Sequence, residues 1–137
     1  NSEKATHERF FRITQLAYIY GFVGHGSIII VFYLLNIKEM MLFNIFVSVP
    51  FFITAYQINK RGKHNIAFTL AFIELLIHQI LGVYYLGWGF GFQYILIYLA
   101  GLTFFNIYWS NRIRFLLLTL VILSFLGMYL FLKDIQV

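Results

Sequence analysis

The chain has 137 residues, of which 61% are hydrophobic, 21% aromatic and only 11% charged. A soluble domain carries roughly a quarter of its residues as charged side chains, so this composition predicts a membrane protein. The formal net charge is +5, but the basic residues lie in short segments between apolar runs, as is usual beside membrane spans, and nucleic-acid binding is not expected. The absence of cysteine excludes disulfides, thiolate metal sites and cysteine nucleophiles.

The first half of the chain predicts a water-side segment followed by two antiparallel spans. Residues 1–12 are polar and basic and are expected to form a cytoplasmic lead-in. Apolar runs then predict spans at about 13–35 and 41–58, joined by a turn too short for any other arrangement. Pro50 falls inside the second run and predicts a kink there.

The second half predicts three further spans. The basic loop 59–64 precedes a run at about 66–86, and an aromatic, glycine-rich turn separates that run from spans at about 93–109 and 115–132. Each run has about 17 to 23 residues, enough to cover most or all of a bilayer core of roughly 30 Å. The sequence therefore predicts an all-α, polytopic transmembrane helical bundle of five spans, with residues 1–137 forming a single membrane domain.

The distribution of lysine and arginine predicts the orientation. Alternate ends of the predicted spans carry eight basic residues on one side and two on the other, which places the N-terminus in the cytoplasm. The eight are Lys4, Arg9, Arg12, Lys60, Arg61, Lys63, Arg112 and Arg114, and the two are Lys38 and Lys133. Five spans leave the C-terminus outside, so a cytoplasmic domain downstream would require a sixth span in the parent protein.

Ionisable residues inside the predicted spans are the candidate functional groups. Glu74 and His78 lie one helical turn apart in the third span, and His25 lies in the first. Charged or titratable side chains in hydrocarbon are costly, and they commonly mark functional sites. The first and third spans run in the same direction, and both histidines lie about 13 or 14 residues from the cytoplasmic end, so the imidazoles are expected at similar depth and can face each other.

This spacing resembles that of bis-histidine b-type haem bundles, in which His25 and His78 would be the axial ligands. Gly24 and Gly26 flank His25 and would leave room for a porphyrin. Two alternatives stay open. His78 and Glu74 could form a structural or proton-linked hydrogen-bonded pair, or His25, Glu74 and His78 could bind Zn²⁺ or another divalent ion.

A second histidine pair is predicted at the cytoplasmic ends of the same two spans. His7 lies 18 residues before His25, and His64 lies 14 residues before His78. These separations correspond to about five and four helical turns, so each pair of histidines lies close to one stripe of its helix. One or two haem groups are therefore compatible with the sequence, and the unequal spacing makes the cytoplasmic pair the weaker candidate.

The third span carries a motif that resembles a known family. Glu74, His78 and the following GWGFGFQY, residues 87–94, resemble the N-terminal membrane region of bacterial class III adenylate or guanylate cyclases, although a histidine often stands there in place of Gln93. The resemblance implies a six-span anchor and receptor module in the bacterial inner membrane. It also implies a homodimer whose lipid-embedded helices regulate a downstream cytoplasmic cyclase domain.

Catalysis within this segment is not expected. The chain has no nucleophile elbow, no zinc-protease helix motif and no phosphate-binding loop. The spans also lack the interrupted helices and inverted repeats that are typical of transporters. The sequence favours a non-catalytic anchor and sensor, with a plain structural anchor as the alternative.

Overall fold

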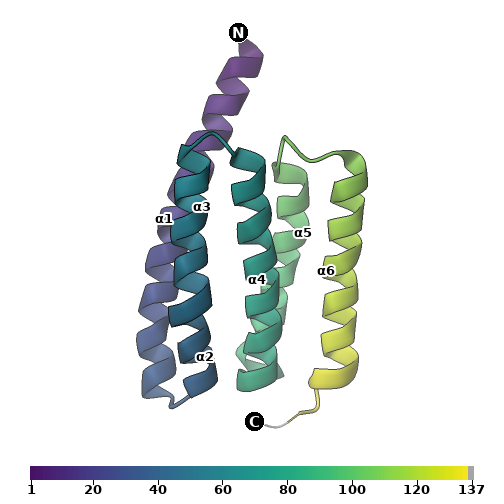
Figure 1. The fold of residues 1–137 in the computed structure, drawn as a ribbon. Coiled ribbons are helices and arrows are strands. Elements are labelled where there is room, and N and C mark those ends of the chain that lie inside the picture. Colours follow the sequence, from purple (N-terminus) through teal and green to yellow (C-terminus); the bar gives the residue numbers. More distant parts are fainter. Residues whose placement is uncertain (136–137) are drawn as a thin grey trace. The chain divides into compact units, whose positions relative to one another are not determined.

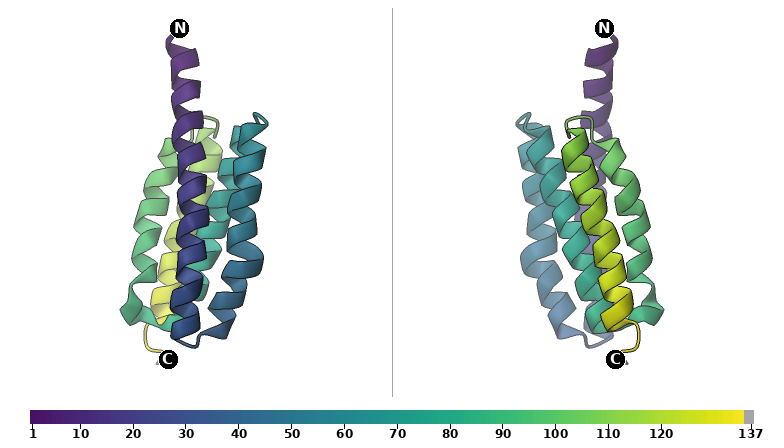
Figure 2. Two further views of the ribbon diagram at one scale, coloured as in Figure 1. Left: turned by 90° about the vertical axis from the view of Figure 1, so that its left-hand side faces the viewer. Right: turned by 90° about the vertical axis from the view of Figure 1, so that its right-hand side faces the viewer.

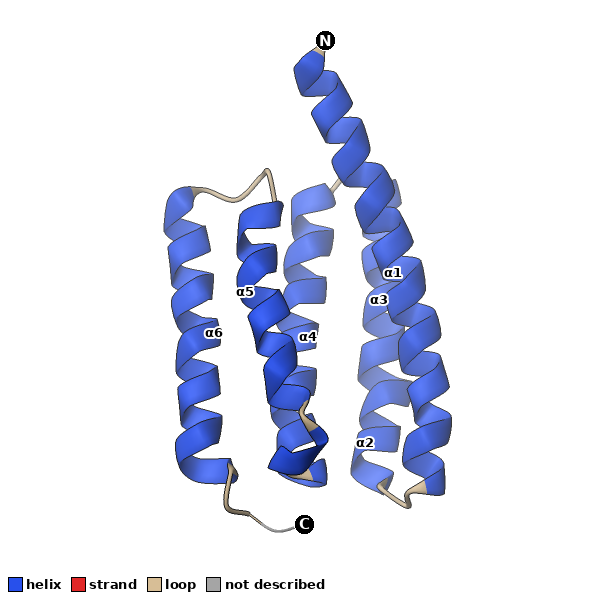
Figure 3. Cartoon of the chain, turned by 180° about the vertical axis from the view of Figure 1, so that it is seen from behind, coloured by secondary structure: helices blue, strands red, loops and turns tan. Residues whose placement is uncertain are grey.

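The computed structural model describes residues 1–135 and is helical, with no strand in that part of the chain (Figure 3). Four helical segments are long and apolar enough to cross a membrane. They are α1 (Ser2–Leu34), the continuous segment Lys38–Lys60, α4 (His64–Leu86) and α6 (Asn111–Leu132). The all-α prediction is confirmed, and the apolar helices support the membrane assignment.

The prediction of five membrane-length helices is wrong in one element. The run predicted as a span at 93–109 forms a shorter apolar helix, Phe92–Phe105, which begins with the 3₁₀ turn η3 (Phe92–Tyr94) and continues as α5 (Ile95–Phe105). Gly91 precedes it in the left-handed conformation, with φ 85°, and Asn106 ends it with extended backbone angles. The Oδ1 atom of Asn106 accepts from the backbone N–H of Tyr108 at 2.9 Å, which directs the chain into a turn instead of another helical turn.

The predicted lead-in is helical from its second residue. Asn1 caps α1, because its Oδ1 atom accepts from the backbone N–H of Glu3 at 2.8 Å. Residues 1–9 are exposed, and these first turns of α1 extend beyond the end of α3 (Figure 2). The polar start of the chain is therefore an extension of the first apolar helix.

The chain divides into two compact units, Asn1–Ala71 and Phe72–Val137. In the first unit, α1 packs along α3 (Val49–Lys60), as Figure 1 shows. The helix α2 (Lys38–Phe43) leads into the π-helical turn η1 (Asn44–Ser48) directly before α3. The predicted irregularity at Pro50 takes this form because proline has no N–H to donate to the preceding turn.

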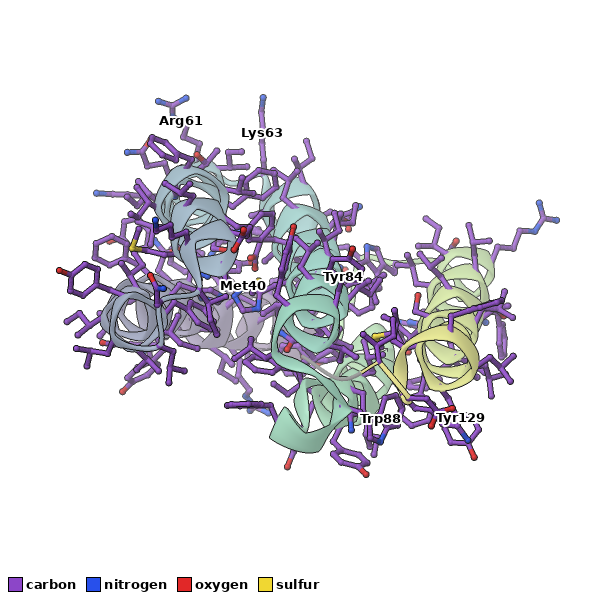
Figure 4. The ribbon with its side chains drawn as sticks, turned by 90° about the horizontal axis from the view of Figure 1, so that it is seen from below. Met40, Arg61, Lys63, Tyr84, Trp88 and Tyr129 are labelled. Atoms are coloured by element: carbon purple, nitrogen blue, oxygen red, sulfur yellow. The ribbon has the colours of Figure 1, made fainter. Side chains whose placement is uncertain are left out.

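In the second unit, α5 packs along α6, and the segment between α4 and α5 packs on the end of α6. The 3₁₀ turn η2 (Trp88–Phe90) brings the indole of Trp88 to 5.8 Å from the rings of both Phe125 and Tyr129, measured between centroids (Figure 4). Lys133 follows α6 and lies over the Tyr129 ring, 4.1 Å from its centroid. A hydrogen bond to Tyr129 raises the pKa of Lys133.

Candidate histidine ligands

His25 lies in the C-terminal half of α1 and is partly buried. Its Nδ1 atom lies 2.8 Å from the carbonyl oxygen of Gly21, one turn earlier in the same helix. A carbonyl oxygen only accepts hydrogen bonds, so Nδ1 must carry the proton, and Nε2 holds the lone pair of the neutral ring. The ring also stacks on Phe52 of α3, with centroids 4.8 Å apart and planes at 28°. The side chain thus has a fixed tautomer and a packed face.

The three glycines around His25 have different roles. A Cβ atom on Gly21 would lie 2.9 Å from Cγ of Phe52 and closer still to two other ring carbons, so this glycine allows α1 to approach α3. Cβ atoms built on Gly24 and Gly26 meet nothing within 4 Å. The helix surface beside His25 is therefore open at the two positions predicted to give a porphyrin room, and in this respect the residues fit an axial haem ligand.

His64 is the first residue of α4, at the same end of the first unit as the start of α1. Its Nδ1 atom lies 2.7 Å from Oδ1 of Asn59, and its ring packs edge-on against Phe11 of α1, with centroids 5.3 Å apart. His7 lies one helical turn before Phe11, is exposed, and is close enough to His64 for their charges to interact. The structure therefore brings the two members of the predicted cytoplasmic pair to one region of the first unit.

Glu74 and His78 are both buried on α4, with exposed fractions of 1% and 2%. Their spacing of four residues places them on one face of the helix, as predicted. The ring of Phe92 lies 6.2 Å from the His78 ring, centroid to centroid, and it also covers Gly82, where a Cβ atom would come within 2.9 Å of its carbons. The segment after α4 thus folds back over the helix surface that carries His78.

His25 belongs to the first unit and His78 to the second, and their pairing stays a prediction. The same holds for the divalent site of His25, Glu74 and His78, which also draws on both units. Within residues 1–135, no three or more His, Cys, Asp or Glu side chains gather as a metal-binding group.

The sequence alone did not identify Asn59 and Phe52 as neighbours of the histidines. Asn59 stood at the start of the predicted basic loop, yet it lies in the last turn of α3 and is fully buried. The signal that could have found it is the helical spacing of Phe52, Ala55 and Asn59, which share one buried face of α3.

Comparison with known proteins gives no match. No protein-family model matches the chain, and no curated protein and no solved structure is significantly similar to it.

Proposed function

We propose that this chain is the membrane anchor and regulatory module of a bacterial nucleotidyl cyclase, and that it binds b-type haem through histidines in its helices. Two features support the proposal. Four helices are long and apolar enough to span a bilayer. The segment from Glu74 to Tyr94 carries the motif that resembles class III cyclase membrane regions.

The observation that carries the haem proposal is the state of His25. Its Nδ1–H donates to the Gly21 carbonyl, and the flanks at Gly24 and Gly26 are open. Histidines that bind metals typically donate the other ring N–H to a backbone carbonyl or a carboxylate, which fixes the tautomer and orients the ring. His25 already has this arrangement within its own helix.

Different residues of the chain would have different roles in such a site. His25 and His78 would provide axial nitrogens, Phe52 and Phe92 would limit the rotation of these two rings, and the apolar helices would exclude water. Haem supplies one-electron redox chemistry and an iron that can bind a diatomic gas, and the axial ligands and burial tune both. A cytoplasmic cyclase domain would respond to the resulting change in helix packing.

The wider setting of the proposal follows the charge distribution and the resemblance. The N-terminus and the basic segments would face the cytoplasm of a bacterial inner membrane. The chain would act as a homodimer, and a sixth span in the parent protein would return the polypeptide to the cyclase domain.

A visible absorption spectrum tests the haem proposal. Protein purified from haem-replete cells is expected to show a Soret band, and His25→Ala or His78→Ala should remove the part of the band that comes from haem bound by these two histidines. Ser27→Ala is a matched control, because Ser27 lies on the same helix and its hydroxyl bonds only the Val23 carbonyl, at 2.8 Å, within the described structure. A colourless wild-type protein under these conditions would reject haem binding.

The cyclase assignment needs the parent protein. Removal of residues 1–137 from a full-length parent is expected to change cyclase activity and weaken dimerisation. Unchanged activity and an unchanged dimer would contradict a regulatory role.

The second candidate is a structural anchor, and the burial of Glu74 and His78 on one face of α4 favours it. Polar side chains between membrane helices fix helix register and contribute about 0.6 to 2 kcal/mol each. This alternative predicts a colourless protein without metal. It also predicts only a small loss of stability for Glu74→Gln, because the amide keeps the shape of the side chain and most of its hydrogen-bonding capacity.

A further inference from the structure

A partly buried polar cluster joins the three helical segments of the first unit at its basic end. Thr14 and Gln15 belong to α1, Asn59 to the last turn of α3, and His64 to the first turn of α4. Asn59 is fully buried and contacts all three of the others. Its Nδ2 atom lies 3.2 Å from Oγ1 of Thr14 and 2.8 Å from Oε1 of Gln15, and its Oδ1 atom lies 2.7 Å from Nδ1 of His64.

The direction of every hydrogen bond in this cluster follows from Thr14. Its hydroxyl has one proton, which it donates to the carbonyl of Phe10 at 2.7 Å. A second contact, to the Phe11 carbonyl at 3.1 Å, also requires donation by the hydroxyl. Towards Asn59 the hydroxyl can therefore only accept, so the amide group of Asn59 must present its NH₂ end to Thr14.

This assignment fixes the opposite end of the amide. With its NH₂ group directed at Thr14 and Gln15, Asn59 presents its oxygen to His64. An amide oxygen only accepts, so Nδ1 of His64 must be the donor, and Nε2 holds the lone pair of the neutral ring. A flipped Asn59 amide would set its oxygen against the Thr14 hydroxyl oxygen, whose proton is already donated to Phe10, and burial makes such an unsatisfied contact costly.

From these contacts we infer that Asn59 is the positioning residue of the cytoplasmic histidine pair: it holds His64 as the Nδ1–H tautomer, so that Nε2 is the nitrogen that binds a metal. Phe11 supports the same ring from α1, and His7 lies one turn further along that helix. The tautomer follows from the cluster alone, whereas its use for a haem iron rests on the proposed function.

His25 and His64 thus share one chemical state, with the proton on Nδ1, although they reach it differently. His25 donates to a carbonyl of its own helix, at Gly21, whereas His64 depends on a side chain from the neighbouring helix. A substitution at Asn59 should therefore affect His64 and leave His25 unchanged. This difference provides an internal control.

Nitrogen NMR of the chain labelled with ¹⁵N-histidine tests the inference without any bound metal. Above about pH 8, where ordinary imidazoles are neutral, His64 is expected to show a protonated Nδ1 and an unprotonated Nε2, with the signal assigned by its loss in His64→Gln. Asn59→Asp retains an acceptor for Nδ1–H, and Gln15 can turn its amide so that the NH₂ group donates to the second carboxylate oxygen, so this variant should keep the tautomer when the ring is neutral. Asn59→Leu removes the acceptor and should give a mixture of tautomers, while the His25 signals stay in place.

Two results would overturn the inference: a protonated Nε2 on His64 in the wild-type protein, or the same His64 tautomer in Asn59→Leu as in Asn59→Asp. If Asn59→Leu does not fold, as altered His25 signals would reveal, the wild-type and Asn59→Asp spectra still decide the question. Hemin titration is the second measurement, with an expected 10- to 100-fold loss of affinity at the His7 and His64 site in Asn59→Leu. Failure of the wild-type chain to bind hemin would reject the haem part of the proposed function and leave the tautomer result standing.

Discussion

Alanine substitutions at Gly21 and Gly24 separate two reasons for a glycine-rich helix around His25. In the interior of a helix, alanine is favoured over glycine by about 0.8–1 kcal/mol. At Gly24 the new methyl group meets no atom within 4 Å, so the chain without cofactor should keep this gain. At Gly21 the methyl group would overlap the Phe52 ring.

Overpacking of this kind costs about 1–3 kcal/mol. The free energies of unfolding of Gly24→Ala and Gly21→Ala should therefore differ by about the same amount, a 5- to 150-fold difference in the unfolding equilibrium. Because Phe52 also stacks on His25, Gly21→Ala should disturb the environment of that imidazole as well. Gly24→Ala should leave it unchanged in the protein without cofactor.

Thermal unfolding in detergent, with matched protein and detergent concentrations, measures the difference. At this chain length, each kcal/mol shifts the midpoint by about 4 °C. Equal stabilities of the two variants, or a less stable Gly24→Ala, would refute the division of roles between these glycines.

Alanine substitutions at Gly24 and Gly26 also test haem binding. Hemin affinity should fall in Gly24→Ala and Gly26→Ala, because each methyl group enters the open space beside His25, although neither destabilises the protein without cofactor. Unchanged hemin affinity in both variants would place the cofactor elsewhere or exclude it.

Two further predictions concern the second unit. Arg114→Gln should lower the free energy of unfolding by about 1.5–3 kcal/mol, because the Arg114 guanidinium donates to the Asn106 carbonyl at 2.9 Å at the end of α5. Substitution of the exposed Arg112 by Gln is the control. Equal midpoints of the two variants in thermal unfolding would contradict this role of Arg114. Gly82→Ala should destabilise the protein by about 1–3 kcal/mol, because the new methyl group would overlap Phe92. Phe92→Leu should relieve much of that cost in the double variant. Strictly additive effects in the double-mutant cycle would show that the two residues do not interact.

The apolar runs predicted most of the helices, because hydropathy and helical length are local properties of the chain. Four of the five predicted spans correspond to helices of membrane length. The remaining span, predicted at 93–109, is shorter because the chain leaves the helix at both ends. Gly91 takes a left-handed conformation, and the Asn106 side chain accepts a hydrogen bond from the backbone of Tyr108. A hydropathy profile detects neither feature, because both residues stand beside aromatic and aliphatic neighbours that extend the apolar run.

The candidate site could also be predicted only in part. The sequence identified the histidines, their helical spacing and the glycines beside His25, and the i−4 carbonyl that holds His25 lies in its own helix. It did not identify Asn59, which sat at the edge of a basic loop and gave no sign that it would be buried. Nor did it show that Gly21 serves helix packing while Gly24 and Gly26 stay open, because that depends on the position of Phe52.

The sequence by itself determined that this protein is built from long apolar helices and that its titratable groups inside them are few and regularly spaced. Only the tertiary structure decided which nitrogen of His64 carries the proton. Thr14 donates its proton to the Phe10 carbonyl and therefore accepts from Asn59, which lies 45 residues away in the sequence. The oxygen of Asn59 is then left to accept from His64. The physical reason is that each hydrogen bond needs one donor and one acceptor, and the side chains that settle which atom is which meet only when the helices pack.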